Sequence, residues 1–267
     1  MWQRAWVGRW MSSGNGRRAA LISTLCALVW GVGLSGPAWA ISSESQEEKA
    51  ANYKKQAQGG LFQKWTFDAD AVGTIPGGFV TLSAEDGGSG LWAVVQDATA
   101  PTTPNVVSAI SECESGPCHR LLLAQGLEYE YPDLSVRFRP VAGAAASGGM
   151  VLGAKDARNF YAAVVDVAGR SARVIRIVDG VVTVLGQAEV TLKPIEWHSL
   201  RMQRNTIISK DFLEVFVDGV LVLSVEDQAL GLGQVGLLAQ GKTSLLFDAF
   251  HAVPLFSHRP LSPPAPY

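Results

Sequence analysis

The sequence predicts an all-β protein in which two antiparallel sheets form a sandwich. From residue 62 onward, short apolar or alternating segments are separated by turn residues, and no segment among them has helical periodicity. Asp179-Gly180 and Asp218-Gly219 are two-residue hairpin signals, each flanked by β-branched residues. The expected strands are 62–68, 78–83, 91–96, 105–110, 120–124, 134–140, 149–153, 160–166, 173–178, 181–185, 189–192, 197–203, 212–217, 220–225, 234–239 and 244–251.

Alternation along the strands assigns their faces. In the segment 133–139, aliphatic and aromatic residues alternate with polar ones, and the segment 212–217 has one aliphatic face and one mixed face. The aliphatic faces of a sandwich meet in its core, so the mixed faces look outward. Where one sheet curves, its outer face forms a groove lined by rings and charges. We expect such a groove to suit a sugar ligand.

The first forty residues predict a secretory signal peptide. Four arginines precede an apolar run from Leu21 to Leu34, and Ala38-Trp39-Ala40 follows as a small-x-small cleavage site. The run is shorter than the ~20 residues of a membrane-spanning helix. Arg17-Arg18 leaves a twin-arginine export route open beside the general secretory route. We therefore expect a periplasmic or secreted bacterial protein.

The mature chain divides into three expected parts. Residues 41–60 form a polar lead-in that favours a short helix, residues 61–253 form the β-sandwich, and residues 254–267 form a proline-rich tail. The leader holds four of the 22 Lys and Arg and none of the 24 Asp and Glu, so the mature charge is 18 − 24 = −6. This balance argues against a nucleic-acid partner, and we expect no membrane span after cleavage.

Short motifs rich in Gly and aromatic residues lie along the expected strands and turns. They are 77–79, 90–94, 100–101, 104–106, 148–151 and 159–161, followed by 197–201 and 217–219. Together these motifs resemble the 3-keto-disaccharide hydrolase-like family of the concanavalin A-like lectin/glucanase superfamily. The resemblance covers about residues 61–253 and implies a concanavalin A-like jelly-roll β-sandwich. It also implies a carbohydrate or glycan as the partner and, in some members, glycoside hydrolysis.

The acidic residues do not form the two-carboxylate pattern of a family-16 glucanase on this fold. Glu214 and Asp218 come nearest, but Asp218 belongs to a turn. Glu128 and Glu130 alternate correctly, but a Tyr-Pro pair follows them at once. The expected function is therefore carbohydrate recognition by an exported protein, with glycoside hydrolysis left open. The alternative is a non-catalytic structural or protein-interaction domain of the cell envelope. The catalytic residues stay unassigned.

Another set of residues predicts a sugar-binding surface. Planar arginine and amide side chains hydrogen-bond sugar hydroxyls, and aromatic rings stack on the apolar faces of sugars. The candidate ligand-binding residues are Trp92, Arg137, Arg139, Arg158, Asn159, Tyr161 and Arg176.

The two cysteines of the mature chain, Cys113 and Cys118, close a short loop and predict a local disulfide in an oxidising compartment. A stretched haem-attachment pattern that ends at His119 is the less favoured alternative. We expect no metal site and no cofactor, with a structural calcium ion left open.

Cleavage after Ala40 is a direct test of export. Amino-terminal sequencing of the protein from the envelope fraction should begin at Ile41, because the small-x-small motif ends at Ala40. A full-length product in the cytoplasm would contradict the prediction.

Overall fold

The computed structural model describes residues 61–83, 90–112, 118–142 and 144–255. The chain divides into two compact units, Met1–Glu44 and Ser45–Tyr267, and the described residues belong to the second. The predicted leader, the lead-in and nearly all of the proline-rich tail lie outside the described residues.

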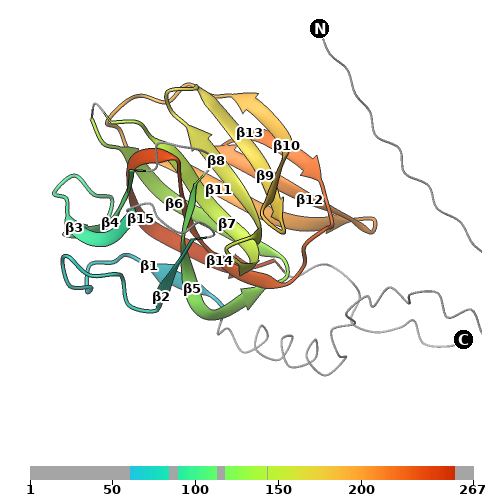
Figure 1. The fold of residues 1–267 in the computed structure, drawn as a ribbon, viewed down its shortest axis with the longest axis horizontal. Helices are drawn as coiled ribbons and strands as arrows, with labels where there is room; N and C mark the ends of the chain where they lie inside the picture. Colours follow the sequence, from blue (N-terminus) through green and yellow to red (C-terminus); the bar gives the residue numbers. More distant parts are fainter. Residues whose placement is uncertain (1–60, 84–89, 113–117, 143, 256–267) are drawn as a thin grey trace, which may run out of the picture. The chain divides into compact units, whose positions relative to one another are not determined.

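The described residues form two antiparallel sheets (Figure 1). In sheet A the order is β13 (Val220–Glu226), β12 (Lys210–Val217), β11 (His198–Ile207), β6 (Pro132–Pro140), β15 (Lys242–Pro254), β4 (Asn105–Glu112) and β3 (Gly90–Gln96), and β1 (Gln63–Trp65) also pairs with β15. In sheet B the order is β10 (Val181–Glu189), β9 (Ser171–Val178), β8 (Asn159–Asp166), β7 (Ser147–Asp156), β14 (Gly233–Gln240), β5 (His119–Tyr129) and β2 (Phe79–Ser83). This architecture confirms the predicted all-β jelly roll.

The two predicted hairpin turns have the expected backbone. Asp179 and Gly180 both have positive φ angles, of 53° and 82°, and they connect β9 to β10. Asp218 and Gly219, at 48° and 80°, connect β12 to β13 in the same way. Two successive positive φ angles match the right-handed twist of the flanking strands, which explains the Asp-Gly preference.

Two predicted strands differ in the structure. The segment 189–192 is not a strand of its own, because Glu189 is the last residue of β10 and pairs with Ser171, the first residue of β9. Beyond it, the Val190 amide donates to the Arg170 carbonyl at 2.9 Å, outside the strand. The segment 62–68 contains only the short β1, and Phe67 has a φ of 63°, outside the strand region.

The inter-sheet core receives alternate residues of both sheets. Leu134, Val136 and Phe138 of β6 are at most 2% exposed, as the alternation predicts. From sheet B, β8 adds Tyr161 and Ala163, which are both fully buried.

The outward side of sheet B is also apolar, which the sequence analysis did not predict. On β8, Phe160, Ala162 and Val164 alternate with the core residues, so they lie on the opposite face. They join a second cluster of buried side chains, which we call the sheet B apolar face. Its buried members are Leu121, Leu123, Val151, Ala154, Phe160, Ala162, Val164, Ile175, Ile177 and Leu238.

His119 alternates with Leu121 on β5 and lies at the rim of the sheet B apolar face. It is 4% exposed, its ring meets the Phe160 ring edge-on at 5.9 Å between centroids, and its Nε2 lies 3.2 Å from Nε2 of Gln240. Burial, together with the nearby charge of Arg173, lowers the pKa of His119 to about 4. The folded protein therefore keeps this imidazole neutral well into the acid range.

Acid should destabilise the fold through His119. The unfolded chain takes up this proton near pH 6.5 and the folded chain near pH 4, so the unfolded state binds more protons between these values. The free energy of unfolding should fall as the pH decreases across this window, by at most about 3 kcal/mol. His119→Gln should lose this part of the pH dependence in urea unfolding measured from pH 7 to pH 4. Equal pH dependence in variant and wild type would contradict the assignment.

Candidate functional site

The outer face of sheet A carries a ladder of polar side chains across β6, β11 and β12. Arg201 of β11 donates to both carboxylate oxygens of Asp133 on β6, at 2.7 and 2.6 Å, and also to Gln203 at 2.9 Å. Glu214 of β12 accepts hydrogen bonds from Gln203 and from Asn205, the latter at 2.8 Å. The face is therefore polar, but its carboxylates already have donors.

Aromatic rings stand among these polar groups. The guanidinium of Arg201 lies over the Phe216 ring, 5.0 Å from its centroid. Phe212 and Phe216 are half-buried and alternate with Glu214 along β12. The mixed face predicted for this strand is therefore present.

At one end of the face, Arg139 and Trp197 form a fixed corner. Arg139 forms an ion pair with Asp97, and its guanidinium lies 5.4 Å from the centroid of the Trp197 ring. Trp197 Nε1 donates to Thr99 Oγ1 at 3.4 Å. Burial alone would raise the pKa of Asp97, but hydrogen bonds from Thr99 and the charge of Arg139 outweigh it and hold the pKa below its ordinary value.

Arg137 lies beside this corner without a carboxylate partner. Its Nη2 donates to the main-chain carbonyl of Trp197 at 3.1 Å, and among the described residues it forms no ion pair. Asp218 lies within the field of Arg137 but binds His198 Nδ1 at 2.7 Å and the Ser199 amide at 2.8 Å. Burial alone would raise the pKa of Asp218. These hydrogen bonds, together with the charges of His198 and Arg137, outweigh burial and hold the pKa below its ordinary value.

Two of the predicted ligand-binding rings are in the core instead. Trp92 is 4% exposed, and its ring lies 5.9 Å from that of Phe247. Tyr161 is fully buried, and its hydroxyl donates to Asp227 and accepts from the Leu230 amide at 3.0 Å. Their placement on an outer groove is wrong, because the register of β3 and β8 turns both rings toward the opposing sheet.

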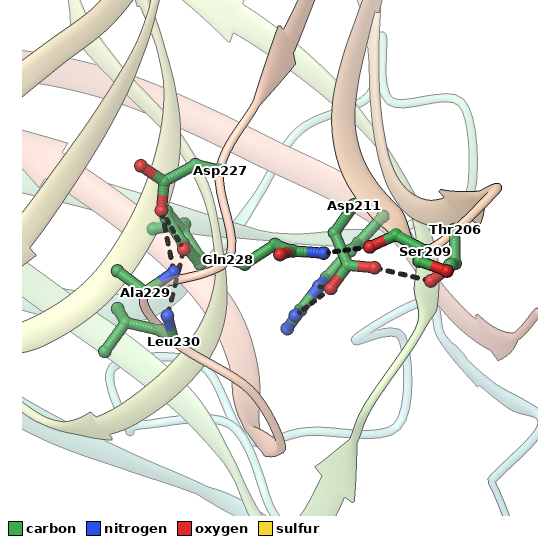
Figure 2. A network of polar contacts seen from close by, with 9 residues as sticks. Thr206, Ser209, Asp211, Asp227, Gln228, Ala229 and Leu230 are labelled. Carbon is green, nitrogen blue, oxygen red and sulfur yellow. Dashed lines mark hydrogen bonds and ion pairs between the residues drawn. The ribbon is translucent and has the colours of Figure 1, made fainter.

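Arg176 belongs to the same internal network as Tyr161. Its Nη1 lies 2.6 Å from Asp227 Oδ2. This carboxylate also caps the turn through the Ala229 amide, as Figure 2 shows. Burial, and then the hydrogen bond to Asp227, raises the pKa of the Tyr161 hydroxyl. Arg176 therefore neutralises a half-buried carboxylate that holds the loop after β13.

Arg158 and Asn159 bind their own hairpin. Arg158 Nη2 donates to the Asp179 carbonyl at 2.6 Å, and Asn159 Oδ1 accepts from the Asp179 amide at 3.0 Å. The carboxylate of Asp156 accepts hydrogen bonds from both residues. The main-chain amide of Arg158 donates at 2.6 Å, and the side-chain amide of Asn159 donates at 3.1 Å. These contacts join the β7–β8 hairpin to the β9–β10 hairpin.

The seven predicted residues therefore do not converge on one site. Only Arg137 and Arg139 lie on the outer face of sheet A, while the other five lie in the core, in the internal network or at the hairpins. Sequence reasoning did not assign Trp197, Arg201 and Gln203 to the surface. The signal was present, because these residues alternate with the buried His198, Leu200 and Met202 along β11.

Three further predictions concern the cysteine pair, a metal site and a membrane span. Cys118 is buried, whereas Cys113 lies outside the described residues, so their pairing stays a prediction. Within the described ranges, no group of three or more His, Cys, Asp or Glu side chains could hold a metal ion. The same part of the chain has no helix that is long and apolar enough to cross a membrane.

Comparison with known proteins identifies the fold but no family. No protein-family model matches the chain, and no curated protein does. A carbohydrate-binding module, CBM66, from Bacillus subtilis is similar in structure, with a TM-score of 0.52 and 16% identity over 66% of this chain and 95% of that one. A Bacillus subtilis protein of unknown function with a galectin-like fold has a TM-score of 0.48 and 9% identity over 72% and 98% of the two chains. The Emp47p carbohydrate recognition domain also has a TM-score of 0.48, with 11% identity over 73% and 97%.

At such low identity, the likeness to CBM66 shows the β-sandwich fold alone. The narrower assignment to the 3-keto-disaccharide hydrolase-like family has no family match behind it.

The different partners of Arg139 and Arg137 predict different effects on stability. Arg139→Ala should lower the free energy of unfolding by about 1–3 kcal/mol, because Asp97 loses a partly buried, charge-assisted partner. Arg137→Ala should change it by about 0.5 kcal/mol or less. Urea unfolding of both variants measures the difference, and equal losses would contradict the assignment.

Proposed function

We propose that this is an exported carbohydrate-recognising protein that binds glycan at the Arg137–Trp197 end of sheet A. The observation that carries the proposal is that the guanidinium of Arg137 forms no ion pair with a carboxylate among the described residues. Arg139 and Arg201 on the same face each have a carboxylate, Asp97 and Asp133, whereas Arg137 has only a main-chain carbonyl. A half-buried cation with spare donors is suited to the hydroxyl and ring oxygens of a sugar.

Trp197 supplies the second element of such a site. It is half-buried, and Arg139 and Thr99 fix its orientation. An indole offers an apolar surface to a sugar ring, and a side chain that is already ordered loses little entropy on binding. The fold likeness to a carbohydrate-binding module supports the same hypothesis.

Hydrolysis is the second candidate, and one observation favours it. Asp133 and Glu214 lie on the same face and flank Gln203, each directly opposite it on a neighbouring strand. Two strand spacings put their Cα atoms roughly 10 Å apart. Side chains of this length let the two carboxyl groups come within the roughly 6.5–9.5 Å that separates them in inverting glycosidases. Both carboxylates are occupied by Arg201, Gln203 and Asn205, so recognition is the better-supported function.

A glycan array combined with a released-sugar assay tests both candidates. The mature chain should bind at least one class of glycan on the array and release no sugar from it. Release of sugar, lost in Glu214→Gln, would favour the hydrolase. Absence of binding to every glycan would remove the carbohydrate proposal and favour the envelope-interaction alternative.

Arg137→Ala should weaken glycan binding by about 1–3 kcal/mol, since a charge-assisted hydrogen bond is lost. Calorimetric titration with a glycan from the array measures this, and thermal melts check that the variant is folded. Arg170→Ala is the control, because Arg170 is an exposed arginine at the β8–β9 turn. Unchanged affinity in Arg137→Ala, or an equal loss in the control, would remove Arg137 from the site.

A further inference from the structure

The sheet B apolar face is wide and continuous. Its buried side chains come from five neighbouring strands, β9, β8, β7, β14 and β5, and Val80 and Leu82 of β2 extend it to the edge of the sheet. Six strands at about 4.8 Å spacing make a surface roughly 24 Å across. A monomer that left such a surface in water would expose an unusually large apolar patch.

The side chains of this face are nevertheless fully covered. Leu121, Leu123, Val151, Phe160 and Leu238 each have 0% exposure in the complete chain. Sheet A covers only the opposite side of sheet B, and every described strand belongs to one of these two sheets. The described strands therefore provide no second layer over this face.

The lengths of the segments outside the described residues indicate which of them can cover the sheet B apolar face. The internal stretches outside the description, 84–89 and 113–117, are too short to cross six strands, and Arg259–Tyr267 holds four prolines. The compact unit that contains the sandwich begins at Ser45, which leaves the sixteen residues 45–60 before Leu61. Gly59-Gly60 ends a helix, so a helix over the fourteen residues 45–58 would span about 21 Å, close to the width of the face.

The sequence of this segment fits the role. Ala50, Tyr53 and Ala57 recur at helical spacing, while the other positions from 46 to 58 carry Glu, Gln, Asn and Lys, apart from Ala51. The residue that follows this segment, Leu61, is anchored in the sandwich. It is 1% exposed, and its carbonyl accepts a hydrogen bond from the Tyr129 hydroxyl at 2.8 Å. Tyr129 is the last residue of β5, the strand that supplies Leu121 and Leu123 to the face.

We propose that residues 45–60 dock as an amphipathic helix on the sheet B apolar face, with Ala50, Tyr53 and Ala57 against it. The protein then has three layers: sheet A, sheet B and this helix. Two alanines allow the helix backbone to approach closely, and the tyrosine ring covers the larger side chains. The charged positions face water.

Paired charge substitutions test the docking in the full mature chain. Ala50→Glu with Ala57→Glu places two carboxylates on the docking side, whereas Ser45→Glu with Asn52→Glu places the same two charges on the opposite side of a helix. The first pair should raise the fluorescence of the apolar dye ANS several-fold and lower the urea midpoint, because the face becomes exposed. The second pair should match the wild type. Equal dye binding in both pairs would overturn the proposal.

A photo-crosslink identifies the occupant. With p-benzoylphenylalanine in place of Tyr53, irradiation should join the segment to peptides of β5, β8 or β14 within one molecule. The same probe at Asn52 should give no such product. A crosslinked dimer would show that a second copy covers the face, and products elsewhere on the chain would likewise overturn the assignment.

Discussion

The structure depends on the period-two alternation of a strand between two layers. Every strand of the sandwich has two faces, and the opposing sheet can cover only one of them. The core side is uniform, because aliphatic and aromatic residues from both sheets fill it. The two sheets differ in the side chains of their outer faces, which are polar on sheet A and apolar on sheet B.

Sheet A keeps its outer face in contact with water by pairing charges. Arg201 with Asp133 and Arg139 with Asp97 place cations beside carboxylates on neighbouring segments, and rings lie under two of these guanidinium groups. The more exposed Arg201–Asp133 pair contributes little to stability, whereas the partly buried Arg139–Asp97 pair contributes more. Both pairs fix side-chain orientation, which a recognition surface requires. Arg137 stands out on this face because it lacks such a partner.

Sheet B takes the opposite course, and its outer face is nearly as apolar as the core. His119, a polar group at the rim of this face, is buried and neutral. Two pairs of opposite charge lie inside the sandwich: Arg204 with Asp211, and Arg176 with Asp227. Removing one partner of the more deeply buried pair, Arg204–Asp211, would leave an uncompensated charge and cost about 3–5 kcal/mol.

The sequence by itself determined the fold class, the position of most strands and the two Asp-Gly turns, because each rests on local periodicity or on backbone conformation at one site. It also determined which residues of β6 face outward. It did not determine the partners of those residues. Arg139 meets Asp97 and Tyr161 meets Asp227 only because strands and loops far apart in the sequence become neighbours, and no local pattern encodes that pairing. Trp92 shows the same limit. Alternation says that one side of a strand is buried, but only the register between the two sheets decides which side that is.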